Sequence, residues 1–155
     1  MLRPWRQTAG DAEALATAWR GAGSQTTTTD VAARWIAGEA GRRAGDRALD
    51  LVVAATGDED AVLGEVGLRN FDPVRGRAEI GWWIVPDRRG EGLATAAVRL
   101  MADWALGPPC DLVQVWARID PANRASSLVA SRAGFTCLGL ASGTEVWALA
   151  ATLRS

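Results

Sequence analysis

The strongest constraint on the fold is an apolar run that ends in a glycine-rich turn and opens onto a helix, over residues 79–94. Ile80 to Val85 is apolar on both faces of a pleated strand, as expected for a strand inside a sheet. Pro86 has no N–H to donate to a ladder, so pairing should end there. Gly90 and Gly92 permit backbone conformations that other residues avoid, and they let a ligand approach closely.

Helical periodicity begins directly after this turn. Apolar residues recur along one stripe at Ala94, Val98, Met101 and Ala105. The first turn of such a helix has unpaired N–H donors and the positive end of the helix dipole. Arg88 and Arg89 add charge in a geometry suited to phosphate. The segment therefore predicts a pyrophosphate pocket, although a glycine-rich strand-to-helix turn with solvated arginines has the same local pattern.

Composition excludes several kinds of chemistry. The chain has no His, Lys or Tyr, and its 17 basic residues are all Arg. A Ser-His-Asp triad, a Walker A lysine, a lysine Schiff base and a histidine-ligated zinc site are therefore impossible, and we expect no metal. A general base must be a carboxylate, a thiolate or a water chain. Net charge is −1, which gives no electrostatic case for nucleic acid or an anionic membrane.

Length and patterning predict one mixed α/β domain over residues 1–155. Two cysteines are too few for a disulfide framework, so we expect a reduced, cytoplasmic protein. No apolar run approaches the roughly 20 residues of a membrane span, and the N-terminus does not read as a signal peptide. Strands are expected at residues 2–6, 49–56, 61–69, 77–85, 111–118, 135–140 and 145–152. Helices are expected at 11–20, at 30–40 with Asp30 as N-cap, from 93 to a stop at Gly107-Pro108-Pro109, and at 121–133. Residues 24–29 should be a loop, 41–47 a charged connector, 57–60 a turn and 70–76 a loop.

Six segments, taken in order, resemble the GNAT superfamily of N-acetyltransferases, and most of all its RimJ/RimL-type branch of ribosomal-protein N-terminal acetyltransferases. They are Leu-Arg-Pro-Trp at 2–5, Leu-Gly-Glu-Val-Gly-Leu at 63–68, Ala-Glu-Ile-Gly-Trp-Trp at 78–83, Arg-Gly-Glu-Gly-Leu-Ala at 89–94, Asn-Arg-Ala-Ser-Ser at 123–127 and Ala-Gly-Phe at 133–135. The resemblance covers nearly the whole chain. One departure is Asp87, which stands where the superfamily has Gln or Arg three places before the first loop glycine. An alternative register, Arg89/Gly92/Ala94, restores that pattern.

The resemblance implies a GNAT fold: a mostly antiparallel twisted sheet of about seven strands, flanked by about four helices. A parallel pair of strands should splay near 82–85 and 113–118. The acyl-pantetheine arm of acetyl-CoA should enter the gap and pair with free backbone groups near Ile84 and Val85. The implied cofactor-binding residues are Ile84, Val85, Arg88, Arg89, Gly90, Glu91, Gly92, Leu93, Ala94, Thr95, Asn123 and Ser126. Asn123 would hold the pantetheine arm or order water, and Ser126 would hydrogen-bond the departing sulfur. Both also fit plain helix-capping roles.

The implied reaction is direct attack of an amine on the acyl thioester, with a base that removes a proton, usually through water. Glu79 is the first candidate base because period-2 counting places it on one face with Gly81 and Trp83. Glu65, on the neighbouring strand, is the second candidate. An ion pair of Glu79 with Arg69, Arg77 or Arg118 is the structural alternative. Because tyrosine is absent, Ser126 is the candidate proton donor.

The amine should bind beside the first two helices, the loop between them and the last hairpin. Candidate substrate-binding residues are Trp19, Trp35, Trp82, Trp83 and Trp147. The acceptor is expected to be a protein N-terminus or a small-molecule amine. The acyl donor is expected to be acetyl-CoA or another acyl-CoA. An acyl-CoA-binding sensor with little catalysis is the alternative function. A homodimer is compatible with the resemblance.

Overall fold

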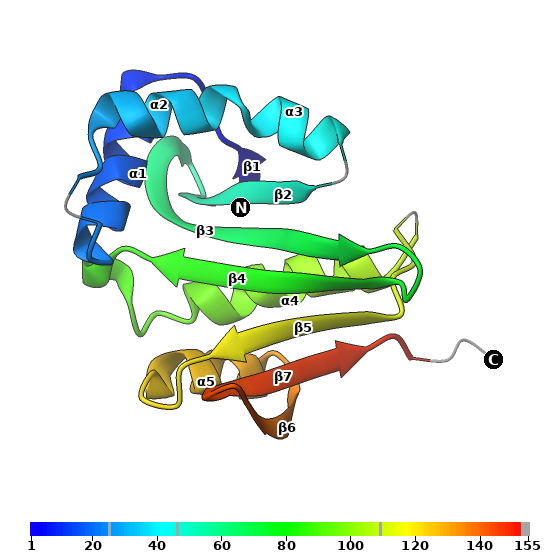
Figure 1. Ribbon diagram of the computed structural model, residues 1–155. Helices are drawn as coiled ribbons and strands as arrows, with labels where there is room; N and C mark the ends of the chain where they lie inside the picture. The colour runs from blue at the N-terminus through cyan, green and yellow to red at the C-terminus, as the bar shows by residue number, and fades with distance from the viewer. Residues whose placement is uncertain (25, 46, 109, 153–155) are drawn as a thin grey trace.

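A seven-stranded sheet organises the molecule, with strand order β1-β2-β3-β4-β5-β7-β6 (Figure 1). The computed structural model describes residues 1–24, 26–45, 47–108 and 110–152. All neighbouring strands are antiparallel except β4 and β5, which run parallel. This confirms the expected mixed fold with one parallel pair. The strands are β1 Leu2–Pro4, β2 Ala48–Ala55, β3 Asp58–Asp72, β4 Arg77–Ile84, β5 Gln114–Ile119, β6 Thr136–Ala141 and β7 Thr144–Ala150.

Helices cover both faces of this sheet, and Figure 1 shows α4 behind it, on the face away from α1. The helices are α1 Ala9–Gly21, α2 Thr29–Ala37, α3 Glu39–Ala44, the 3-10 helix η1 Pro86–Arg88, α4 Leu93–Leu106 and α5 Arg124–Arg132. Among the described residues, no helix combines the length and apolar character needed to cross a membrane.

Two apolar cores result from the alternation of side chains along the strands. Val66, Leu68 and Ile80 pack on one face with Val98 and Met101 of α4. On the other face, Leu15 and Ile36 of α1 and α2 pack with Val52 and Trp5. The second core covers the sheet over β1–β3. In Figure 1, no helix of the described residues lies over β4 and β5 on the face turned away from α4.

Several boundaries differ from the expected ones. The N-cap of α2 is Thr28, whose hydroxyl accepts from the Val31 N–H at 3.3 Å, so Asp30 lies in the first turn instead. Gly38 ends α2, and part of the expected connector forms α3. The expected 57–60 turn is shorter, since β3 begins at Asp58 and then continues to Asp72 across the start of the expected 70–76 loop. Gln25, Asp46 and Pro109, within the expected loop, connector and helix stop, lie outside the described residues.

The parallel pairing of β4 with β5 is short. It consists of Arg77↔Gln114, Ala78↔Val115 and Glu79↔Trp116. β4 continues to Ile84 and β5 to Ile119, and in the described part of the chain no pairing joins them beyond this point. The strands therefore separate after Glu79 on β4 and after Trp116 on β5. The expected splay holds for 82–85, but within 113–118 it begins only beyond Trp116.

A buried ion pair fastens β1 to α1. The Arg3 guanidinium donates to both carboxylate oxygens of Asp11, at 2.7 and 2.8 Å. Arg3 and Asp11 are 5% and 2% exposed. Arg3 also donates to the Glu59 carbonyl at 2.6 Å, and Asp11 accepts from the Arg6 N–H at 2.8 Å. This network fixes the direction in which the chain leaves β1 and carries Trp5 toward the sheet.

We expect Asp11→Asn to lower the free energy of unfolding by about 3–5 kcal/mol, because the Arg3 guanidinium would remain buried without a counter-charge. Urea unfolding followed by circular dichroism measures the change. Asp60→Asn is the matched control, because it removes the exposed partner that Arg6 contacts at 2.8 Å and should change stability little. Equal losses in both variants would contradict a special role for the buried pair.

Candidate active site

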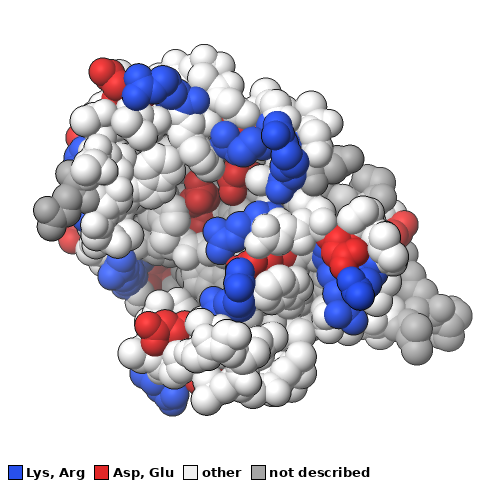
Figure 2. Space-filling view, viewed as in Figure 1, with Lys and Arg blue, Asp and Glu red and all other residues white. Residues whose placement is uncertain are grey.

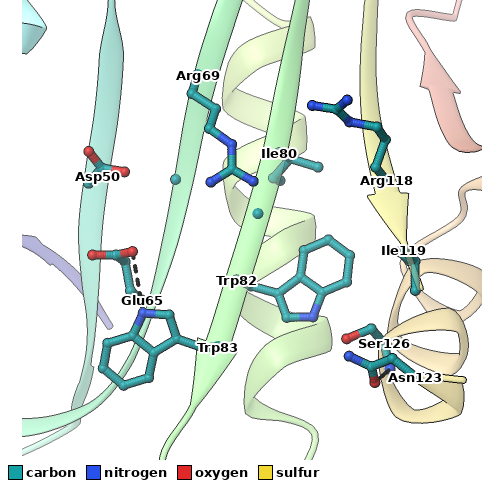
Figure 3. A pocket seen from close by; sticks show the side chains of 12 residues that line it. Asp50, Glu65, Arg69, Ile80, Trp82, Trp83, Arg118, Ile119, Asn123 and Ser126 are labelled. Atoms are coloured by element: carbon teal, nitrogen blue, oxygen red, sulfur yellow. Dashed lines mark hydrogen bonds between the residues drawn. The ribbon is translucent and has the colours of Figure 1, made fainter. Parts of the chain in front are cut away.

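Two cavities meet where β4 and β5 separate. The loop cavity, of 330 Å³, is lined by Trp82, Trp83, Ile84, Arg88, Arg89, Gly90, Gly92, Leu93, Ala94, Thr95, Asn123, Ala125, Ser126, Leu128, Val129 and Arg132. The sheet cavity, of 250 Å³, is lined by Asp50, Glu65, Gly67, Arg69, Ile80, Gly81, Trp82, Trp83, Arg118, Ile119, Asn123 and Ser126 (Figure 3). Four residues line both: Trp82, Trp83, Asn123 and Ser126. Ligands in the two cavities would therefore meet at these residues.

The loop cavity owes its shape to two glycines in left-handed conformations. Gly90 has φ 82°, and Gly92, the N-cap of α4, has φ 81°. A Cβ at either position would meet no atom within 4 Å, so backbone conformation and the need for open space explain the glycines. The first N–H groups of α4 open at this cavity, as an anion site requires.

Ten of the twelve sequence-predicted cofactor residues line the loop cavity, and Val85 and Glu91 are absent from its lining. The Glu91 carboxylate instead pairs with Arg88, whose Nε and Nη2 contact its oxygens at 2.8 and 2.9 Å. The hydrogen bond from Arg88 lowers the pKa of Glu91. Sequence reasoning missed Arg132 and three neighbours on α5, although the spacing 125, 128/129, 132 marks one helix face.

The backbone groups at the end of β4 are partly occupied. The Val85 N–H donates to the Leu63 carbonyl at 2.9 Å, and the Ile84 carbonyl accepts from Arg89 Nε at 3.0 Å. This corrects the expectation that the backbone near Ile84 and Val85 is free. Because successive residues of a strand present their N–H groups to opposite sides, Trp82 and Ile84 direct theirs toward β5, beyond the last β4–β5 pair.

Glu65 is held in the sheet cavity by two indole groups. Its Oε2 accepts from Trp5 Nε1 at 2.8 Å and its Oε1 from Trp83 Nε1 at 3.3 Å (Figure 3). Burial raises the pKa of Glu65 to about 7; the charge of Asp50 adds to this, and the indole hydrogen bonds oppose it. This carboxyl can therefore accept a proton near neutral pH.

Glycines on either side of Glu65 allow its strand to lie close to its neighbours. A Cβ at Gly64 would come within 2.2 Å of the Trp83 carbonyl oxygen. A Cβ at Gly67 would come within 2.4 Å of Asp50 Oδ1. Asp50, which lies opposite Gly67 on β2, therefore extends its carboxylate across the face of β3. Burial raises the pKa of Asp50 as well.

Glu79 is an ion-pair centre that does not line either cavity. It is 2% exposed and accepts from Asn70 Nδ2 at 2.6 Å, Arg118 Nη2 at 3.2 Å and Arg69 Nη2 at 3.4 Å. Burial alone would raise its pKa, but these donors outweigh burial and the pKa of Glu79 is lowered. The structural alternative foreseen for Glu79 is therefore realised, with Arg69 and Arg118 as partners.

Asn123 and Ser126 combine a capping and a cavity-lining position. Asn123 is the N-cap of α5, and its Oδ1 accepts from the Ser126 N–H at 3.1 Å. Figure 3 shows the Ser126 hydroxyl on the side of the helix that faces Trp82. The cap thus fixes Ser126 at the junction of the two cavities.

Two of the five predicted substrate-binding tryptophans, Trp82 and Trp83, line the cavities. Trp19 and Trp35 instead form an edge-to-face pair, with centroids 5.6 Å apart, and pack against the α1–α2 core. Trp147 donates to Glu145 at 2.9 Å and packs against the other core. These three tryptophans contribute to packing and line neither cavity.

Charged residues that sequence reasoning did not assign to the site also line the sheet cavity: Asp50, Arg69 and Arg118. Figure 2 shows acidic side chains inside the hollow on this face and arginines around it. Their common signal is that each is a charged residue inside a strand: Asp50 in β2, Arg69 in β3 and Arg118 in β5.

Comparison with known proteins gives matches to one family. The model of the family described as "Acetyltransferase (GNAT) domain" matches residues 1–136. A Bacillus subtilis (strain 168) protein named "Putative ribosomal N-acetyltransferase YdaF" is 34% identical over 77 residues, which is 50% of this chain and 42% of that protein. The matched part is thus under half the length of this curated relative.

Solved structures share the fold. RimJ from Mycobacterium smegmatis in complex with CoA-disulfide superposes with a TM-score of 0.82 at 21% identity, covering 97% of this chain and 81% of that chain. A variant of the spermidine N-acetyltransferase SpeG from Vibrio cholerae gives a TM-score of 0.73 at 15% identity, covering 96% and 92%. At these identities the likeness establishes the architecture.

Proposed function

The chain belongs to the acetyltransferase (GNAT) domain family, and we propose that it transfers the acetyl group of acetyl-CoA to a primary amine by direct attack. The resemblance stated from the sequence is confirmed for the superfamily. The names of the relatives support the RimJ/RimL-type branch as part of this proposal. Residues 1–155 would act as a single domain without a metal. The acceptor is a protein N-terminus or a small amine, since the relatives bear the names of ribosomal-protein and spermidine acetyltransferases.

The observation that carries this proposal is the junction of the two cavities. The pyrophosphate of CoA would lie on the N-terminus of α4, where Gly90 and Gly92 open the backbone. The thioester would then reach the junction residues Trp82 and Ser126. An amine that enters through the sheet cavity meets the thioester there, so both reactants are held in one place.

Glu65 is the base in this proposal, in place of Glu79. A base must stand within reach of the amine and have a pKa near the working pH, and Glu65 lines the sheet cavity with a pKa of about 7. Glu79 lies outside the cavity lining and is engaged by Asn70 and two arginines. A carboxyl tuned to neutral pH in the acceptor cavity favours catalysis over a purely acyl-CoA-sensing role.

The chemical step follows from these positions. The amine nitrogen, once neutral, forms a bond to the thioester carbonyl carbon, and its surplus proton passes to Glu65, directly or through water. The backbone N–H of Trp82 is directed into the gap between β4 and β5 and would stabilise the oxyanion. Collapse of the tetrahedral intermediate breaks the carbon–sulfur bond, and the thiolate leaves beside the Ser126 hydroxyl, which can donate a hydrogen bond.

We expect kcat/KM of the wild-type protein to rise as pH increases through about 7, because the base must be unprotonated. Glu65→Gln should abolish that rise and lower kcat/KM about 10²–10⁴-fold at pH 8. Acetyl-CoA affinity should persist, since Glu65 does not line the loop cavity. Thiol release measured from pH 5.5 to 9 gives the profile.

Glu79→Gln is the matched control for this profile, as it removes the neighbouring strand's carboxylate on the same face. The rise through about pH 7 should remain in that variant. If instead Glu79→Gln flattens the profile and Glu65→Gln retains it, the assignment of the base is wrong.

Acetyl-CoA binding can be tested by substitution at Gly92, with Gly143, a glycine of the same backbone conformation, as the control position. Gly92→Ala puts a methyl group where the pyrophosphate would approach, and should weaken acetyl-CoA binding at least about tenfold. Gly143→Ala is the control, because Gly143 has φ 82° and open space around its Cβ position in the β6–β7 hairpin. Both variants should lose similar stability from left-handed strain, about 1–2 kcal/mol. Calorimetric titration separates them, and unchanged affinity in Gly92→Ala would refute the pocket assignment.

A further inference from the structure

The sheet cavity has charges of opposite sign in two separate places. Asp50 and Glu65, from β2 and β3, lie together on one side. Arg69 and Arg118, from β3 and β5, lie on the other side, and Figure 3 shows their side chains extending toward β4 from its two sides. An acceptor that fills this cavity therefore contacts acidic and basic groups at once.

The two arginines keep donors for a ligand. They are bound to Glu79 through one nitrogen each, at 3.4 and 3.2 Å, and their side chains are 59% and 53% exposed. A guanidinium has five N–H donors, so each retains several after this contact. Two guanidinium groups around one carboxylate also leave a net positive charge. The Trp116 ring, 5.3 Å from the Arg118 guanidinium carbon, supports that side chain.

Gly81 positions Arg69 over the floor of the cavity. A Cβ at Gly81 would lie 3.2 Å from Arg69 Nη2, so the missing side chain leaves room for the guanidinium. Gly81 precedes Trp83 by two residues, and Trp83 lies opposite Glu65. Two strand residues span about 7 Å, so the part of β4 under the Arg69 guanidinium lies about 7 Å along the strand from the part opposite Glu65.

We infer that the acceptor is an amine that carries an anionic group, a carboxylate or phosphate, about 7 Å from its reacting nitrogen. The inference rests on the proposed acetyl transfer. Glu65 and Asp50 would receive the amine, and Arg69 and Arg118 would bind the anion with charge-assisted hydrogen bonds. A peptide N-terminus with an acidic second residue has this spacing, as does a small amino acid of similar length. Polyamines, which have no anion, would leave the remaining guanidinium donors without an anionic ligand.

Matched acceptors that differ in charge alone test this inference. One pair is the peptide amides Ala-Asp-Ala-Ala and Ala-Asn-Ala-Ala, and the other is 5-aminopentanoate and 5-aminopentanamide. With saturating acetyl-CoA, we expect kcat/KM to favour the acid of at least one pair by about tenfold or more. Calorimetry of the same four compounds with the CoA-saturated protein should show the same order of affinity.

Variants assign the preference to the arginines. Arg118→Gln should bring the acid-to-neutral ratio to within about threefold of unity, and Arg118→Lys should restore part of it. Arg75→Gln is the control, because it removes the same charge from the β3–β4 turn, where Arg75 pairs with Asp72, and should keep the ratio. A ratio retained in Arg118→Gln and in Arg69→Gln would overturn the assignment.

The outcomes separate this inference from the proposed function. Preference for the acid in one pair identifies the source as peptide or small molecule and supports the inference. Thiol release without preference in either pair overturns the inference and leaves acetyl transfer standing. Absence of thiol release with every acceptor refutes the proposed function, and the calorimetric comparison still decides whether the cavity selects an anion.

Discussion

The early end of the β4–β5 ladder is the constraint on which the rest of the site depends. Parallel strands normally bond along their whole overlap, but here the register ends with Glu79↔Trp116 while both strands continue. Backbone groups of Trp82 and Ile84 are thereby directed into a gap. The two cavities join at that gap, and the α5 N-cap places Ser126 beside it. The core packed against α4 lies on one side of this opening.

Two carboxylates on neighbouring strands show how environment divides similar residues into different roles. Burial and the nearby charge of Asp50 both disfavour the charged form of Glu65, so its pKa rises from 4.5 to about 7. Glu79 has Asn70 and two arginines, and its pKa falls. Their effects on stability are opposite in sign. The stability that Glu65 contributes is present below about pH 4.5 and is lost as pH rises toward 7, whereas that of Glu79 is present above about pH 4.5 and is lost as pH falls below it.

How much the sequence could reveal depended on the range of the interactions involved. The glycine-rich turn and the helix after it are local features, so the lining residues between 84 and 95 were foreseen, whereas four lining residues of α5 were not. The choice between Glu65 and Glu79 was not local. The β3–β4 register places both on one face of the sheet. What distinguishes them is their side-chain partners: two indoles for Glu65, and two arginines and Asn70 for Glu79. Asp50 was missed because its carboxylate reaches the site across Gly67 of another strand.

The two indoles that hold Glu65 have a consequence for how this site can be observed. Trp5 and Trp83 each donate their ring N–H to the same carboxylate, so a proton gained or lost there changes the electric field along both rings. Indole emission depends on that field. The group proposed to move the proton is therefore coupled to two intrinsic fluorophores, and its titration can be followed optically in the unlabelled protein.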